Sequence, residues 1–237
     1  MAAEISWLSL SWCLLPFVVS VLIYRKWHSD PKGILMAGAR MLIQLVLVGY
    51  ALVILFDYSS AGYSSLVLLI MALIAGLIAI RPVKNQSNIY LPAFLAIVIS
   101  VALHLFISLK AVMQVMHWYE PRTLIPLAGM YLANTMNAIS LAAERLYSES
   151  KNLREDADAH RLAFQSSMIP QINSLLAVGL VALPGMMTGQ ILSGVSPLIA
   201  VRYQIMIMTM VLGSGIMGVV LFFWFQKKLQ KPPLEPS

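Results

Sequence analysis

Long runs of apolar residues, separated by short polar or charged segments, recur along the whole chain. Each run is close to the roughly 20 residues that an α-helix needs to cross the hydrocarbon core of a membrane. Strict alternation of polar and apolar residues, which is typical of a membrane β-barrel strand, does not recur in the runs. The pattern therefore predicts an all-α, polytopic integral membrane protein, because a helix satisfies its own backbone within lipid.

The runs predict seven transmembrane helices within one transmembrane domain, residues 1–226. The uncharged stretch 162–201 is too long for one crossing, and Gly and Pro residues near 193–197 divide it. We expect the proline-rich residues 227–237 to form a cytoplasmic tail. The predicted spans are residues 5–24, 33–56, 63–80, 87–109, 123–143, 171–192 and 197–225.

Lys and Arg residues predict the orientation, because short loops that carry them stay on the cytoplasmic side. With the N-terminus outside, all but Lys110, Arg122 and Arg202 of the 16 basic residues face the cytoplasm. The first run has no basic residue before it and is followed by Arg25 and Lys26, which is typical of a retained anchor and not of a signal peptide. We therefore predict an outside N-terminus and a cytoplasmic C-terminus.

Composition agrees with a membrane protein. Of the 237 residues, 59% are apolar and only 11% are charged, against roughly 25% charged in an ordinary soluble domain. The net charge of +6 does not indicate nucleic-acid binding, because the basic residues sit beside apolar runs and form no basic stripe interleaved with aromatics. Cys13 is the only cysteine, so an intramolecular disulfide and a cysteine metal cluster are excluded.

The segment 144–167 is the longest soluble stretch between two spans, and it contains five of the ten acidic residues. Leu146, Leu153, Leu162 and Phe164 are spaced among its charges, which favours a partly amphipathic cytoplasmic helix. A solvated extension of the fifth span explains the same pattern equally well.

Motifs for catalysis are absent from the sequence. It holds no phosphate-binding G-x-x-x-x-G-K-[ST] loop, no H-E-x-x-H zinc helix and no G-x-S-x-G turn. The predicted spans contain no Asp or Glu, which disfavours ion-coupled secondary transport. The last span has no Lys for a retinal Schiff base, so a retinal pump is excluded. We therefore predict no enzyme, no catalytic residue and no bound cofactor.

Two amides lie near the middle of the fifth span. Asn134 and Asn137 are three residues apart and share a helical face with Met130. Polar groups within a bilayer are costly, so these residues are candidates for lining a translocation path. The alternative is that both amides only bond to neighbouring helices, which contributes about 1 kcal/mol each.

The segment 184–189, Pro-Gly-Met-Met-Thr-Gly, is the most unusual string in the chain. Pro184 predicts a kink, and Gly185 and Gly189 together form a small-xxx-small packing face. The string is therefore a candidate hinge beside Met186 and Met187, or a packing feature alone.

Three segments together resemble a known family. They are 38–50 (Gly-Ala-Arg-Met-Leu-Ile-Gln-Leu-Val-Leu-Val-Gly-Tyr), 125–136 (Ile-Pro-Leu-Ala-Gly-Met-Tyr-Leu-Ala-Asn-Thr-Met), and the Leu-Pro-Gly-Met-Met-Thr-Gly string 183–189 with Tyr-Gln-Ile-Met at 203–206. In this order they resemble the FetB-type permeases, a family of bacterial iron-export permeases and plant aluminium-tolerance homologues. The resemblance extends from the second predicted helix to the seventh.

The resemblance implies the membrane subunit of an ATP-binding-cassette exporter in the bacterial inner membrane. Two permeases would pair with two separate ATPase subunits, which use the ATP, and Leu153, Leu162 and Phe164 would contact the ATPase. Iron would be the cargo, although thioethers and amides do not favour ferric iron and the metal ligands stay unknown. The residues that we expect along the path are Met130, Asn134, Asn137, Met186 and Met187. A membrane sensor or scaffold that binds a partner through 144–167 is the alternative.

Overall fold

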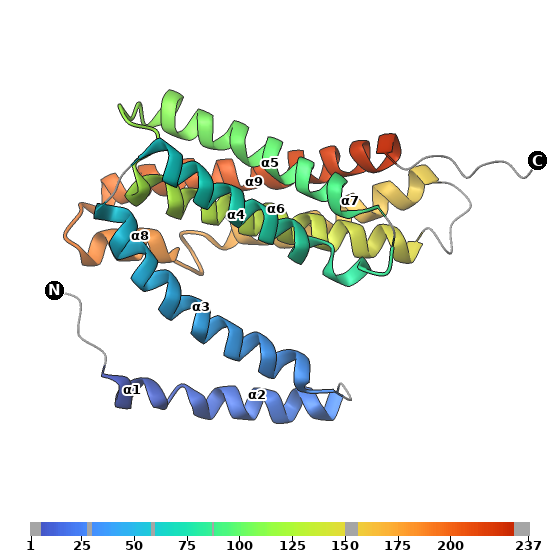
Figure 1. The fold of residues 1–237 in the computed structure, drawn as a ribbon, viewed down its shortest axis with the longest axis horizontal. Coiled ribbons are helices and arrows are strands. Elements are labelled where there is room, and N and C mark those ends of the chain that lie inside the picture. Colours follow the sequence, from blue (N-terminus) through green and yellow to red (C-terminus); the bar gives the residue numbers. More distant parts are fainter. Residues whose placement is uncertain (1–5, 28–29, 58–59, 87, 150–155, 230–237) are drawn as a thin grey trace, which may run out of the picture. The chain divides into compact units, whose positions relative to one another are not determined.

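The computed structural model describes residues 6–27, 30–57, 60–86, 88–149 and 156–229. These residues are mostly helical, as predicted, and among them the only β-type pairing is an isolated bridge between Val178 and Ala182. The chain divides into two compact units, Met1–Tyr58 and Ser59–Ser237. The two are described separately below (Figure 1).

The first unit contains α1 (Trp7–Ser11), α2 (Leu14–Trp27) and α3 (Lys32–Asp57). The Ser6 hydroxyl caps α1 by accepting a hydrogen bond from the Ser9 N–H at 3.0 Å. Gly38 lets α3 approach α2, because a Cβ at this position would overlap the ring of Phe17. The second predicted span therefore appears as one helix of the expected length, α3, and the first as a helical run, Leu8–Trp27, that is long enough to cross a membrane and has a turn at residues 12–13.

The second unit contains the remaining helices. Ser60 caps α4 by accepting from the Tyr63 N–H. A π-helical segment, η2, prolongs α5, and a 3-10 turn, η1, follows α4. The elements are α4 (Ala61–Ala79), η1 (Arg81–Val83), α5 (Tyr90–Phe106), η2 (Ile107–Val112), α6 (Pro121–Glu149), α7 (Asp156–Ala177), α8 (Gly185–Leu192) and α9 (Pro197–Leu229).

Six helices in the described part of the chain are long and apolar enough to cross a membrane. They correspond to the predicted spans except the sixth, 171–192, which is not one helix. α7 ends at Ala177 and α8 begins at Gly185. Gly179 has a φ of +85°, and Pro184 is extended, with a ψ of 143°, at the N-cap of α8. The prediction of a proline kink within a continuous helix is therefore wrong, because the chain leaves the helix altogether.

The segment 144–167 combines both predicted alternatives. α6 extends the fifth span to Glu149, and α7 supplies a second helix from Asp156. Leu146, Ala159 and Ala163 form a small buried cluster against which Phe223 of α9 packs. The start of α7 is therefore fixed to α6 and α9. Leu153 and the tail beyond residue 229 lie outside the described residues.

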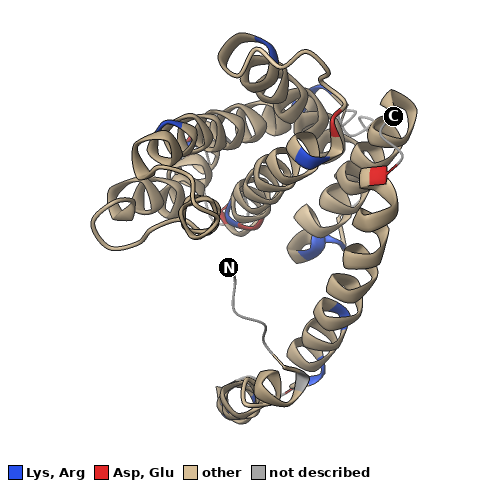
Figure 2. Cartoon of the chain, turned by 90° about the vertical axis from the view of Figure 1, so that its left-hand side faces the viewer, with Lys and Arg blue, Asp and Glu red and all other residues tan. Residues whose placement is uncertain are grey.

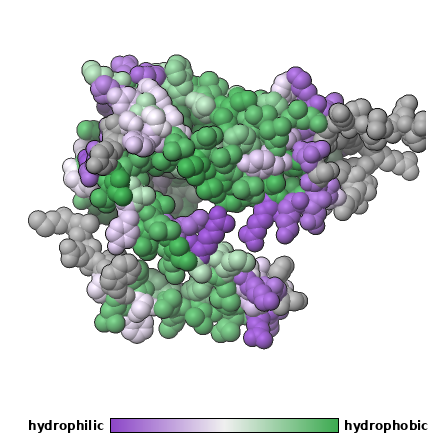
Figure 3. Space-filling model, in the orientation of Figure 1, coloured by the Kyte–Doolittle hydropathy of each residue, from purple (hydrophilic) through white to green (hydrophobic). Residues whose placement is uncertain are grey.

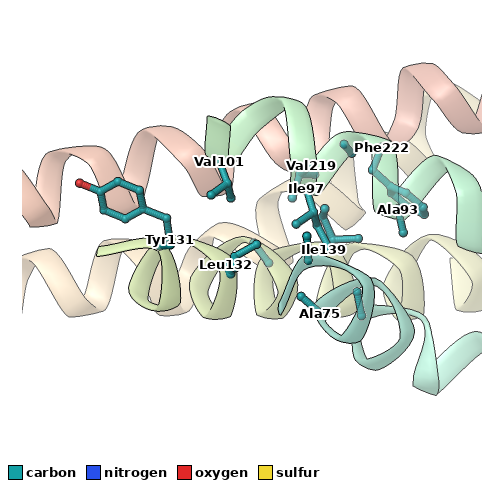
Figure 4. Packing of buried hydrophobic residues seen from close by; sticks show 14 of the residues in the cluster. Ala75, Ala93, Ile97, Val101, Tyr131, Leu132, Ile139, Val219 and Phe222 are labelled. Atoms are coloured by element: carbon teal, nitrogen blue, oxygen red, sulfur yellow. The ribbon is translucent and has the colours of Figure 1, made fainter. Parts of the chain in front are cut away.

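The core of the second unit lies where α4, α5, α6 and α9 meet. Ile97, Ile139 and Val219 point toward one another at its centre (Figure 4). Small residues bring the helices close: a Cβ on Gly76 would lie 3.2 Å from the Tyr90 ring. Close backbone approach through small residues is typical of membrane helices, because lipid gives little hydrophobic drive between them.

The outer helix surfaces are apolar. Hydrophobic residues cover most of the visible surface in Figure 3, and the segments coloured for charged residues are sparse along the helices in Figure 2. Large apolar side chains such as Leu77, Leu91 and Phe106 are exposed. Such surfaces would aggregate in water, and they agree with an integral membrane protein.

Candidate functional site

A layer of polar side chains joins the helices inside the second unit. The Ser100 hydroxyl on α5 donates to the Ser214 carbonyl on α9 at 2.7 Å. Ser108 and Tyr131 share a hydrogen bond of 2.7 Å between η2 and α6. The His104 Nδ1 lies 2.7 Å from the Ser100 carbonyl, and its ring packs beside Gly213. Because each of these groups has a partner within the bundle, the layer is structural.

Asn134 belongs to this layer. Its Nδ2 donates to the Val211 carbonyl on α9 at 2.8 Å. Gly215 leaves the space for this contact, since a Cβ there would lie 3.0 Å from the amide nitrogen. Gln171 of α7, only 7% exposed, lies near the same point of Gly215. The Asn134 amide therefore joins α6 to α9, as the packing alternative predicts.

The other two residues of the predicted α6 face differ from Asn134. The Asn137 side chain is exposed, whereas Met130 is half-buried and packs against the core. Among the described residues, none of the three lines the same cavity as Met187. Their role as path residues stays a prediction.

We expect Asn134→Ala to lower the free energy of unfolding by about 1 kcal/mol, the usual contribution of an interhelical hydrogen bond in a membrane. Asn137→Ala is the matched control, because its amide is exposed and surface changes usually stay within about 0.5 kcal/mol. Thermal midpoints of the two purified variants check this expectation. Equal midpoints would show that the Asn134 bond to α9 is not stabilising.

The break between α7 and α8 borders a cavity of about 300 Å³. α9 closes the opposite side, since α7 and α8 both pack on this helix. The cavity is lined by Leu175, Val178, Gly179, Leu183, Pro184, Met187, Val201, Gln204, Ile205, Met208 and Thr209.

The backbone of the break forms its own tight turn. The Ala177 carbonyl accepts from the N–H groups of Leu180, Val181 and Ala182, at 3.3, 2.8 and 3.1 Å. The Gly179 N–H donates to the Ala182 carbonyl at 3.0 Å. Non-helical backbone within a membrane is tolerated where it is buried in protein or lines a cavity, and this turn lines one.

Few polar side chains face the cavity. Gln204 is 5% exposed, and the Thr209 hydroxyl donates to the Ile205 carbonyl at 2.9 Å. Met187 and Met208 add two thioethers. The described residues contain no group of three or more His, Cys, Asp or Glu side chains that could hold a metal ion. A cargo in this cavity would therefore meet amide, hydroxyl, thioether and backbone groups.

The cavity contains two of the residues singled out from the sequence, Pro184 and Met187. Met186 packs against the core instead, and a Cβ on Gly185 or Gly189 would meet no atom of the described chain within 4 Å. These two glycines therefore form no packing face within this unit.

The sequence reasoning assigned no path or hinge role to the other nine lining residues, although Leu183, Gln204 and Ile205 lie in the strings that carry the family resemblance. Gly179 followed by Pro184 is a stop-and-start signal for two helices, and it would have located the break. Gln204 and Met208 are one turn apart on α9, but nothing in the sequence shows that their face of the helix meets the cavity.

A family model described as an uncharacterised protein family, UPF0014, matches residues 6–229. The chain belongs to the UPF0014 family. The UPF0014 membrane protein slr1647 of Synechocystis is 34% identical to it, with 92% of this chain and 90% of the relative covered.

Two further UPF0014 relatives have names that refer to a function. The probable iron export permease protein FetB of Escherichia coli is 30% identical, with 90% of this chain and 87% of FetB covered. The protein ALUMINUM SENSITIVE 3 of Arabidopsis thaliana is 29% identical, with 82% and 76% covered. No solved structure matches the chain. The resemblance to FetB-type permeases is therefore confirmed, and the chain is a membrane permease of this family.

Proposed function

We propose that this chain is the permease subunit of an ATP-binding-cassette exporter in the bacterial inner membrane, with a metal such as iron as cargo. The observation that carries the proposal is the broken helix α7–α8 with its cavity against α9. Transporters commonly place their substrate sites at discontinuous helices, where freed backbone groups face the cargo. The relative named as an iron export permease supports the choice of cargo.

The break supplies what a transient cargo site requires. Its turn is closed by local hydrogen bonds to Ala177, so it needs no side chain to hold it in place. α8 has only eight residues and is capped by no side chain. A short helix beyond a turn has few contacts to lose when it moves, so α8 is the element that we expect to open and close the cavity.

A separate ATPase supplies the energy in this proposal, because the sequence holds no phosphate-binding loop. The start of α7 is the contact that we propose, through Leu162 and the exposed Arg161 beside it. Phe164 is a poorer candidate, because it packs against the core. α7 continues from this contact to the break at Ala177, so a shift at one end reaches the cavity through a single helix.

Two copies of the chain and two ATPases form the complex in this proposal, with the C-terminus on the ATPase side. ATP is bound and hydrolysed by the partner, and the permease binds no cofactor. Ferrous iron suits the cavity better than ferric iron, because thioether and amide ligands are softer than the carboxylates that a hard cation prefers.

We expect vesicles that contain the chain and its co-purified ATPase to move ferrous iron only when ATP is supplied. Met187→Ala should lower this flux by about tenfold, equivalent to roughly 1.4 kcal/mol of lost stabilisation, because it removes a thioether from the cavity. Met186→Ala is the control, since Met186 is not among the lining residues.

Iron flux and ATP hydrolysis are measured together in vesicles that hold equal amounts of complex. ATP hydrolysis without iron movement would contradict iron as the cargo, but it would not contradict the assignment as an ATP-driven transporter. Failure of any ATPase to bind the chain would contradict the ATP-driven exporter itself.

A further inference from the structure

A second cavity, separate from the one at the break, lies between α4 and α5. The two helices touch at Gly76, where a Cβ would lie 3.2 Å from Tyr90 and 3.5 Å from Phe94. Beyond this contact a crevice of about 560 Å³ opens between Ala72 and Val98, and Leu132 of α6 also lines it. The crevice continues along α5 to Lys110 in η2.

The lining changes character only at the Lys110 end. Lys110 is the single charged group among the described lining residues, and Trp118 is the single residue there with an indole N–H. The rest of the lining is aliphatic or Phe. An apolar crevice with a cation and an indole at one end has the polarity of a membrane lipid, whose chains are apolar and whose headgroup is polar.

Hydrogen bonds place the Lys110 ammonium group. Its Nζ donates to the Val115 and Met116 carbonyls at 3.3 and 3.4 Å, just before Trp118 in the chain. An ammonium has three donors, so one N–H remains for a further acceptor. No described carboxylate forms an ion pair with Lys110. A negatively charged ligand would therefore find an uncompensated positive charge here.

The crevice is elongated along α5. Its lining residues Val98 and Lys110 are twelve residues apart, which is about 18 Å at about 1.5 Å per residue of helix. An acyl chain can lie along this apolar length, and its headgroup then reaches the charged end at Lys110.

We propose that this crevice binds an anionic glycerophospholipid, with one acyl chain between α4 and α5 and the phosphate on Lys110. Trp118 then lies at the level of the headgroup, where Trp residues are enriched in membrane proteins. The site is separate from the α7–α8 cavity and shares no lining residue with it. The proposal is thus independent of the cargo and of the ATPase.

The test is native mass spectrometry of the full-length chain, purified in detergent and mixed with equal amounts of phosphatidylglycerol and phosphatidylcholine. The wild type should retain phosphatidylglycerol at least about fivefold over phosphatidylcholine. Lys110→Gln should remove this preference, and Lys84→Gln, at another exposed lysine of the same unit, should keep it. Ala102→Phe should lower retention of both lipids, because the ring fills the crevice from an exposed lining position.

Two results in the lipid mixture, and one in a competition experiment, would overturn the proposal. One is an unchanged preference in Lys110→Gln, which would place the anionic lipid elsewhere on the protein. The other is equal retention of both lipids by the wild type, which would mean that the crevice does not select an anionic headgroup. An excess of glycerol 3-phosphate should not displace the bound lipid, and displacement would show that a free phosphate, and no acyl chain, occupies the site.

Discussion

Gly218→Leu is expected to destabilise the second unit strongly. A Cβ at Gly218 already overlaps the methyl group of Thr135, which is fully buried on α6 and, being β-branched, has little freedom to turn away. A leucine also brings three more carbons into the same contact. Overpacking of this kind usually costs about 1–3 kcal/mol and occasionally more, and we expect the upper end of that range.

The thermal midpoint of the purified protein should fall by about 6–12 °C, at about 2–4 °C per kcal/mol for a chain of this length, and most of the variant should aggregate. Gly189→Leu is the matched control, because a Cβ there meets no described atom within 4 Å. The small-xxx-small pattern of Gly185 and Gly189 in the sequence predicts instead that Gly189→Leu destabilises the protein more than Gly218→Leu does. If Gly189→Leu destabilises the monomer as much as Gly218→Leu, Gly218 is not the glycine that permits close helix packing.

A paired change separates the steric cause from a general loss of fold. Gly218→Ala should destabilise the protein, although alanine at an open helical site gains about 1 kcal/mol over glycine. Thr135→Ser removes the methyl group that the new Cβ would meet. In the Thr135→Ser background, Gly218→Ala should therefore cost little, and the coupling in a double-mutant cycle measures the contact. If the destabilisations caused by Gly218→Ala and Thr135→Ser simply add in the double variant, the proposed steric contact between the two positions is contradicted.

The fold could be predicted from the sequence to the extent that it depends on helix length and hydropathy. Runs such as 33–56 and 197–225 appear as α3 (Lys32–Asp57) and α9 (Pro197–Leu229). Hydropathy could not reveal the break at residues 178–184, because the segment is as apolar as a membrane-spanning helix. It contains Val178, Leu180, Val181 and Leu183. The break depends on the φ of one glycine and the missing N–H of one proline.

The roles of side chains in the candidate site could likewise be predicted only in part from the sequence. Asn134 and Asn137 were equivalent in the sequence, three residues apart on one face. The structure separates them, because Gly215 of α9 leaves room for the Asn134 amide to reach Val211. That space belongs to a helix some eighty residues away, so no local pattern encodes it. Met187 and Pro184 were singled out because an unusual string is visible locally. Gln204 lies in the Tyr-Gln-Ile-Met string at 203–206, but no local pattern placed it beside the break.

Gly179→Val is expected to abolish transport more completely than any other change in the α7–α8 cavity. Gly179 has a φ of +85°, a conformation in which a β-branched residue is strained by about 1–3 kcal/mol. The substitution therefore favours states in which the turn is lost, and the valine side chain enters the lining of the cavity. Because each 1.36 kcal/mol corresponds to a factor of ten, we expect ATP-driven iron flux to fall by about ten- to a hundredfold.

Gly194→Val provides the matched control. Gly194, between α8 and α9, has a similar φ of +91° and also has open space where a Cβ would lie, but it does not line the cavity. Backbone strain should therefore lower the thermal midpoint of both variants by similar amounts, while only Gly179→Val loses flux per assembled complex. If a valine prevents assembly, Gly179→Ala and Gly194→Ala make the same comparison with a smaller side chain. Equal flux in the two variants would mean that the cavity beside the break does not carry the cargo, because the strain alone would then account for the effect.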